Sequence, residues 1–166
     1  MARVPTGPDT STGDGVLRGR LIAAAAVVAV LATLHFADHV IRGWLVTDRG
    51  LDPAWNHSGW PFQPRITPFT ISLLLVYALL LGGIFFTRRG QLWAGYWLGA
   101  AIVLGAIVTQ VHFVPGPNTE YPSVIVDTYG SPAAGIPAVI IVLAIVAALV
   151  FMAGQAIWVR RLSGRW

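Results

Sequence analysis

Residues 21–41 are LIAAAAVVAVLATLHFADHVI, an apolar run whose last third carries His35, Asp38 and His39. A bilayer core of about 30 Å is spanned by a helix of about 20 apolar residues. Three further runs of similar length follow, at about 66–87, 92–114 and 133–159. The first run has no convincing small-residue cleavage site, so we interpret it as a retained helix. The sequence therefore predicts an all-α integral membrane protein with four transmembrane helices.

The composition supports a membrane protein and excludes several kinds of chemistry. Only 11% of the 166 residues are charged, compared with about 25% in an average soluble domain. The chain has no cysteine, which excludes disulfides and thiolate metal ligands. It also has no lysine, so a cofactor held as a lysine Schiff base is excluded. The arginines form no basic stripe, and nucleic acid is not an expected partner.

The arginine distribution predicts the topology. The connection Arg88-Arg89-Gly90-Gln91 is so short that its flanking helices must form a hairpin. Eight arginines fall on the side of this hairpin and of both termini, and three on the opposite side: Arg42, Arg49 and Arg65. The positive-inside rule then places both termini in the cytoplasm.

These observations predict an antiparallel four-helix bundle, with its N- and C-termini inside, in the plasma (inner) membrane of a bacterium. Residues 1–15, rich in Pro, Thr and Gly, are expected to form a disordered cytoplasmic tail. Residues 16–166 are expected to form a single transmembrane domain. Its outer loops would be 43–65 and 115–132.

One face of the first helix carries the strongest functional signal. His35, Asp38, His39 and Arg42 occupy positions i, i+3, i+4 and i+7, and so lie within an arc of about 100°. Ionisable groups in a membrane helix are costly and indicate a functional site. Two histidines at i and i+4 can bind one metal ion. His112, at similar depth on the helix 92–114, is the candidate third ligand.

The other members of this cluster have several candidate roles. Asp38 is a fourth ligand or the carboxylate that orients an imidazole. Arg42 pairs with Asp38 or holds an anionic group of a cofactor. His57 is a candidate lid residue over the site, and Glu120 and Asp127 are secondary candidates to complete the ligand set.

The sequence leaves several functions open. The leading hypothesis is a zinc or copper site, with a lipophilic small molecule as substrate if the protein is an enzyme. A second is a haem-binding or quinone-linked electron-transfer subunit, with His112 and His35 or His39 as axial ligands and Arg42 near a propionate. A third is a non-enzymatic accessory subunit of a larger membrane complex, or a homo-oligomer, with Gly95 and Gly99 as a GxxxG contact. A metal-free proton or substrate site and a purely structural cluster also remain, and the sequence assigns no catalytic residue.

Overall fold

A computed structural model describes residues 10–48, 68–115 and 119–163. Within these ranges the chain forms five helices and no strand. They are α1 (Thr10–Asp48), α2 (Pro68–Arg88), α3 (Ala94–Phe113), α4 (Pro122–Tyr129) and α5 (Pro132–Ser163). All but α4 are long and apolar enough to cross a membrane, which confirms the prediction of four such helices.

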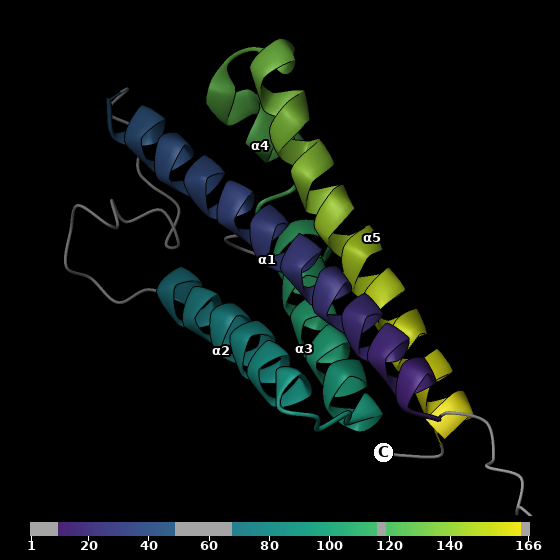
Figure 1. Ribbon diagram of the computed structural model, residues 1–166. Helices are drawn as coiled ribbons and strands as arrows, with labels where there is room; N and C mark the ends of the chain where they lie inside the picture. Colours follow the sequence, from purple (N-terminus) through teal and green to yellow (C-terminus); the bar gives the residue numbers. More distant parts are fainter. Residues whose placement is uncertain (1–9, 49–67, 116–118, 164–166) are drawn as a thin grey trace, which may run out of the picture.

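Helix α5 packs against two of the other three long helices (Figure 1). α1 and α3 both lie against α5, whereas α2 packs on the flank of α1 and α3. The start of α1, the α2–α3 connection and the end of α5 lie toward one end of the molecule, and α4 lies at the other end. α4 contacts both α5 and α1. It lies at the end of the molecule where α1 carries its polar stripe, which consists of His35, Asp38, His39 and Arg42.

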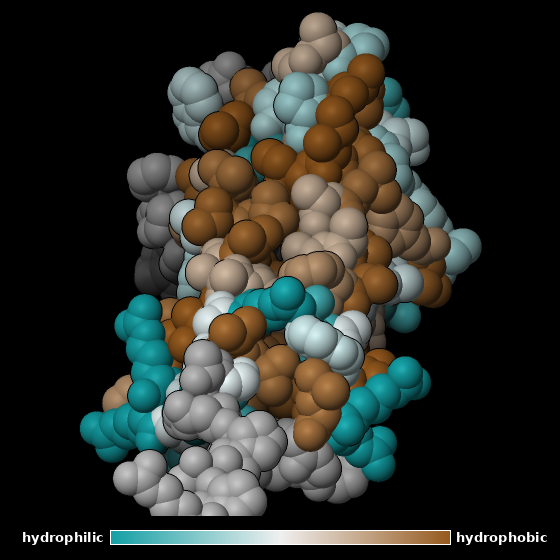
Figure 2. Space-filling view, turned by 45° about the vertical axis from the view of Figure 1, so that its right-hand side comes forward, coloured by the Kyte–Doolittle hydropathy of each residue, from teal (hydrophilic) through white to brown (hydrophobic). Residues whose placement is uncertain are grey.

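The core is apolar, and so is much of the outer surface. Leu21, Trp97 and Met152 from α1, α3 and α5 are almost completely buried in one cluster. Leu74 and Val150 are about two-thirds exposed, at 67% and 68%. Figure 2 shows large apolar side chains over much of the middle of the molecule, with many hydrophilic ones toward its lower end. Such a surface suits contact with lipid, because large exposed apolar patches are unfavourable in water.

The connection between α2 and α3 is closed by side-chain hydrogen bonds. Trp97 donates its indole N–H to Thr87 Oγ1 at 3.0 Å, and the Tyr96 hydroxyl donates to the Leu79 carbonyl at 2.6 Å. Gly90 has a φ of 92°, a conformation that glycine adopts without strain. These contacts fix α2 against α3 at the end of the molecule opposite α4.

Two segments differ from the sequence prediction. Residues 10–15 belong to α1 although a disordered tail was expected there, and residues 1–9 lie outside the described part. Helix formation here continues beyond the apolar run, with an ion pair between Asp14 and Arg18 one turn apart. The segment 115–132, predicted as the second outer loop, contains α4. Pro122 and Gly130 delimit this helix, because proline is favoured at the start of a helix and glycine in the left-handed conformation at its end.

Candidate metal centre

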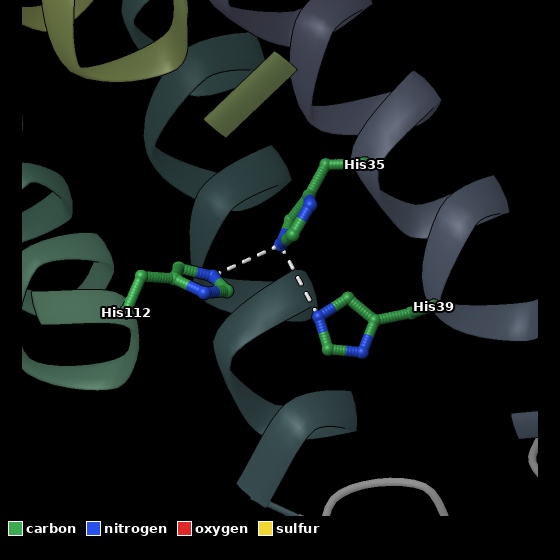
Figure 3. Close-up of side chains that lie close together, drawn as sticks. All are labelled: His35, His39 and His112. Atoms are coloured by element: carbon green, nitrogen blue, oxygen red, sulfur yellow. Dashed lines mark hydrogen bonds between the residues drawn. The ribbon is translucent and has the colours of Figure 1, made fainter. Parts of the chain in front are cut away.

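Three histidine side chains from α1 and α3 meet inside the molecule (Figure 3). His35 Nε2 lies 3.2 Å from His39 Nε2 and 3.2 Å from His112 Nε2. One nitrogen from each of the three rings lies within 4.8 Å of the others. His39 and His112 are buried, and His35 is partly buried. The convergence of His39 and His112 expected from their similar depth is therefore found.

A backbone carbonyl sets the orientation of the His112 ring. Its Nδ1 lies 3.0 Å from the carbonyl oxygen of Glu120. A carbonyl oxygen only accepts hydrogen bonds, so Nδ1 carries the proton, and in the neutral ring Nε2 presents its lone pair to His35. The Glu120 N–H donates to the Val111 carbonyl at 2.8 Å, which folds the segment after α3 back onto the end of that helix. Metal-binding histidines are commonly oriented by such a hydrogen bond, from one ring N–H to a carbonyl or carboxylate oxygen.

The three Nε2 atoms cannot all make favourable contacts as neutral imidazoles. His39 Nε2 also lies 3.4 Å from the Glu120 carboxylate oxygen Oε2, which favours a proton on that nitrogen. If His35 Nε2 also carries a proton, the protons of His35 and His39 oppose each other. If it carries none, its lone pair faces the lone pair of His112. With His39 Nε2 protonated, either neutral state of His35 therefore leaves one of these close contacts unfavourable, whereas a cation between the rings could accept all three lone pairs.

A buried ion-pair network lies beside the three histidines. Arg42 is completely buried and donates from Nε to Asp38 Oδ2 at 2.8 Å and from Nη1 to Glu120 Oε2 at 2.9 Å. The Tyr129 hydroxyl of α4 donates to Asp38 Oδ1 at 2.5 Å. Two carboxylates and one guanidinium carry a formal charge of −1. Because buried charge is costly in an apolar environment, this network favours an additional positive charge nearby.

Burial and the neighbouring Asp38 carboxylate raise the pKa of Tyr129. The hydroxyl therefore keeps its proton and acts as a donor throughout the physiological range. α4 is thereby connected to the α1 stripe by a hydrogen bond to a charged acceptor, the stronger class of hydrogen bond.

On the side opposite the buried ion-pair network, the histidine cluster borders an apolar pocket of about 220 Å³. The pocket is lined by residues of α1, α2, α3 and α5, among them Val28, Ala32, Val76, Leu104, Val108 and Leu149. His35, His39 and His112 also line it, but Asp38, Arg42 and Glu120 do not. Along α1, Val28 lies seven residues before His35 and Arg42 seven residues after it. The three imidazoles thus separate an apolar pocket from a charged network.

The candidate residues named from the sequence are placed as follows. Asp38 is beside the cluster, but its oxygens face Arg42 and Tyr129, and its distance of 3.9 Å to His35 is to Nδ1. Arg42 binds two carboxylates of the chain, one of which is the expected partner Asp38.

Of the secondary candidates, only Glu120 is found at the site. Asp127 is exposed, and its backbone carbonyl caps the end of α4 by accepting from the Gly130 N–H. His57 lies outside the described residues. Tyr129 was not predicted, because a tyrosine in a polar connecting segment has no distinguishing pattern in the sequence.

No protein-family model matches the chain, and neither curated proteins nor solved structures give a match.

Proposed function

We propose that this chain is an integral membrane protein that binds a transition metal ion, zinc or copper, through His35, His39 and His112. Zinc–nitrogen bonds of about 2.0–2.1 Å in a tetrahedral centre place two ligand nitrogens about 3.3 Å apart. Two of the Nε2–Nε2 separations are 3.2 Å, close to this value. Imidazole is a good ligand for both metals.

The single observation that carries this proposal is the conflict among the three Nε2 atoms. A metal ion removes the conflict because each neutral imidazole directs a lone pair toward it. The same ion offsets the formal charge of −1 on the neighbouring Asp38, Arg42 and Glu120. Asp38 then acts on the site indirectly, through Arg42, and Glu120 orients His112 through its backbone carbonyl.

Three protein ligands leave one position of a tetrahedral metal ion for a further ligand, as in catalytic zinc sites. Such an ion supplies a Lewis acid that can activate water or polarise a substrate oxygen. The chain contributes the three imidazoles, an apolar pocket on one side of them and Glu120 on the other. A lipophilic substrate is therefore the proposed class if the protein is an enzyme.

The proposal includes the topology inferred from the sequence: an antiparallel bundle in the plasma membrane, with both termini in the cytoplasm. It is supported by the arginines of the α2–α3 connection and of the end of α5, which lie toward the same end of the molecule. The positive-inside rule assigns that end to the cytoplasm. The histidine cluster then belongs to the outer half of the membrane.

The alternative of a haem is disfavoured by the position of His35. A haem between two axial imidazoles lies in the plane that separates their nitrogens. For His39 and His112 that region holds His35, whose Nε2 is 3.2 Å from each of theirs. The third imidazole would have to leave before a macrocycle could enter.

Metal analysis of the detergent-purified protein tests the proposal. The protein is prepared with an affinity tag that contains no histidine, and metal content is measured by mass spectrometry before and after incubation with zinc or copper. Stoichiometric metal is expected in the wild type and in the control His57→Ala, and loss of metal in His39→Ala and His112→Ala. Wild-type protein without stoichiometric metal, or His39→Ala with unchanged content, would refute it. A Soret absorption band would instead indicate haem.

A further inference from the structure

The pocket beside the histidines has the chemistry of a site for hydrocarbon. Apart from the three imidazoles, Ser72 is the only side chain in its lining that carries a polar atom. The part of its wall farthest from the imidazoles includes Val28 and Leu104. Val28 lies seven residues before His35, and Leu104 lies eight residues before His112. At 1.5 Å per residue, the pocket extends about 10 Å from the imidazoles along the helices.

The size of the pocket limits its occupant. An apolar cavity of about 150 Å³ holds benzene. A volume of 220 Å³ therefore accommodates a short segment of one hydrocarbon chain, but not two chains side by side. A polar solute has no favourable contact with most of this lining, because a buried polar group without hydrogen bonds is costly.

The position of the pocket indicates how an occupant enters. All of its walls belong to candidate membrane-spanning helices, and on the α2 side they are the partly exposed residues Ser72, Leu73 and Val76. On the side away from the pocket, the imidazoles are covered by the buried side chains of Asp38, Arg42 and Glu120. Among the described residues, entry beside α2 from the bilayer is thus the less obstructed route.

From these features we infer that the pocket binds a lipid with a single hydrocarbon chain, whose oxygen-bearing head lies at the histidine cluster. The contact of the lipid head with a metal ion rests on the proposed function. The occupancy of the pocket by the hydrocarbon chain does not depend on it. Such a lipid is the substrate or ligand class for the open metal position. Carboxylate and hydroxyl oxygens are acceptable zinc ligands beside imidazole.

Photo-cross-linking in a bilayer tests the occupancy of the pocket. The full chain is reconstituted in phosphatidylcholine vesicles with palmitic acid that carries a diazirine in the middle of its chain, irradiated, and the adducts are located by mass spectrometry. We expect adducts on pocket residues such as Val28 and Leu104. Val76→Trp, which fills the pocket from α2, should lose them, whereas Leu74→Trp on the lipid-facing side of α2 should retain them.

A second variant guards against misfolding. Leu149→Phe narrows the pocket from α5, and it should reduce the same adducts if Val76→Trp does not fold. Adducts confined to exposed residues such as Ile102, or pocket adducts that persist in the folded variants, would overturn the inference.

The contact between head and metal needs a separate measurement. In the cobalt-substituted wild type, palmitic acid should shift the visible absorption of the metal, and in Val76→Trp with unchanged cobalt content it should not. Pocket adducts in a protein that binds no metal would refute the proposed function while supporting hydrocarbon binding. Bound metal without pocket adducts would refute only the present inference.

Discussion

Replacing Arg42 with methionine should strongly destabilise the protein. The substitution removes the guanidinium that binds both Asp38 and Glu120 and leaves two carboxylates that are 5% and 1% exposed. Removing one partner of a buried ion pair costs about 3–5 kcal/mol. At 1.4 kcal/mol per factor of ten, the folding equilibrium should fall by about two to three and a half orders of magnitude.

The other end of α1 offers a matched control. Arg18 pairs with Asp14 at 3.9 Å, also one turn apart, but these side chains are 33% and 30% exposed. Arg18→Met should therefore cost no more than about 1 kcal/mol. The free energy of unfolding is measured by titration with sodium dodecyl sulfate in mixed micelles, with a chelator present so that metal binding does not contribute.

A triple variant distinguishes the cost of losing the arginine from the cost of leaving two buried carboxylates without a countercharge. Asp38→Asn and Glu120→Gln, added to Arg42→Met, remove both negative charges while keeping similar side-chain volumes. Replacing a whole buried ion-pair group is often close to neutral, so the triple variant should recover much of the lost stability. If Arg42→Met costs no more than Arg18→Met, then water reaches this network and its charges are not buried.

Two further predictions concern α4 and its attachment. Tyr129→Phe should cost about 1.5–3 kcal/mol, because it removes a hydrogen bond to the charged Asp38. Since the pKa of Tyr129 is raised on folding, its contribution is full below the ordinary tyrosine pKa of about 10 and is lost at higher pH. Unfolding measured against pH should show a steeper alkaline loss in the wild type than in the variant. Gly135→Ala should cost about 1–3 kcal/mol, because its new Cβ would lie 2.5 Å from the Val126 backbone. Gly154→Ala, with nothing within 4 Å, is the control on the same helix, and equal unfolding energies for the two would contradict the packing of α4 on α5.

The four long helices could be predicted because a single property, the length of an apolar run, determines them. Their ends could not be placed as well. α1 runs from Thr10 to Asp48, well beyond the apolar run 21–41, because a helix does not have to stop where hydrophobicity stops. The short helix α4 was missed because the eight residues Pro122–Tyr129 are too few to show a long apolar period.

The convergence of the three histidines could be predicted from the sequence because helical geometry is regular. The i, i+4 spacing places His35 and His39 on one face, and a count from the C-terminal ends of the predicted helices gives His112 a depth similar to that of His39. The positions of Glu120 and Tyr129 could not be predicted in this way. Glu120 is placed by a backbone hydrogen bond to Val111, and Tyr129 by the packing of α4 against α5, neither of which follows from a periodic pattern. That metal binds to the three histidines stays a prediction.

The pairing of His35 with His112 joins positions 77 residues apart in a chain that has no cysteine. α1 and α3 each pack mainly on α5, so the imidazoles form a direct bridge between two helices that otherwise share a common neighbour. A metal ion bound there would close a loop containing all of α2, and closing a long loop lowers the conformational entropy of the unfolded chain. The histidines would then serve as a reversible cross-link, with the topological role that a disulfide has in other proteins.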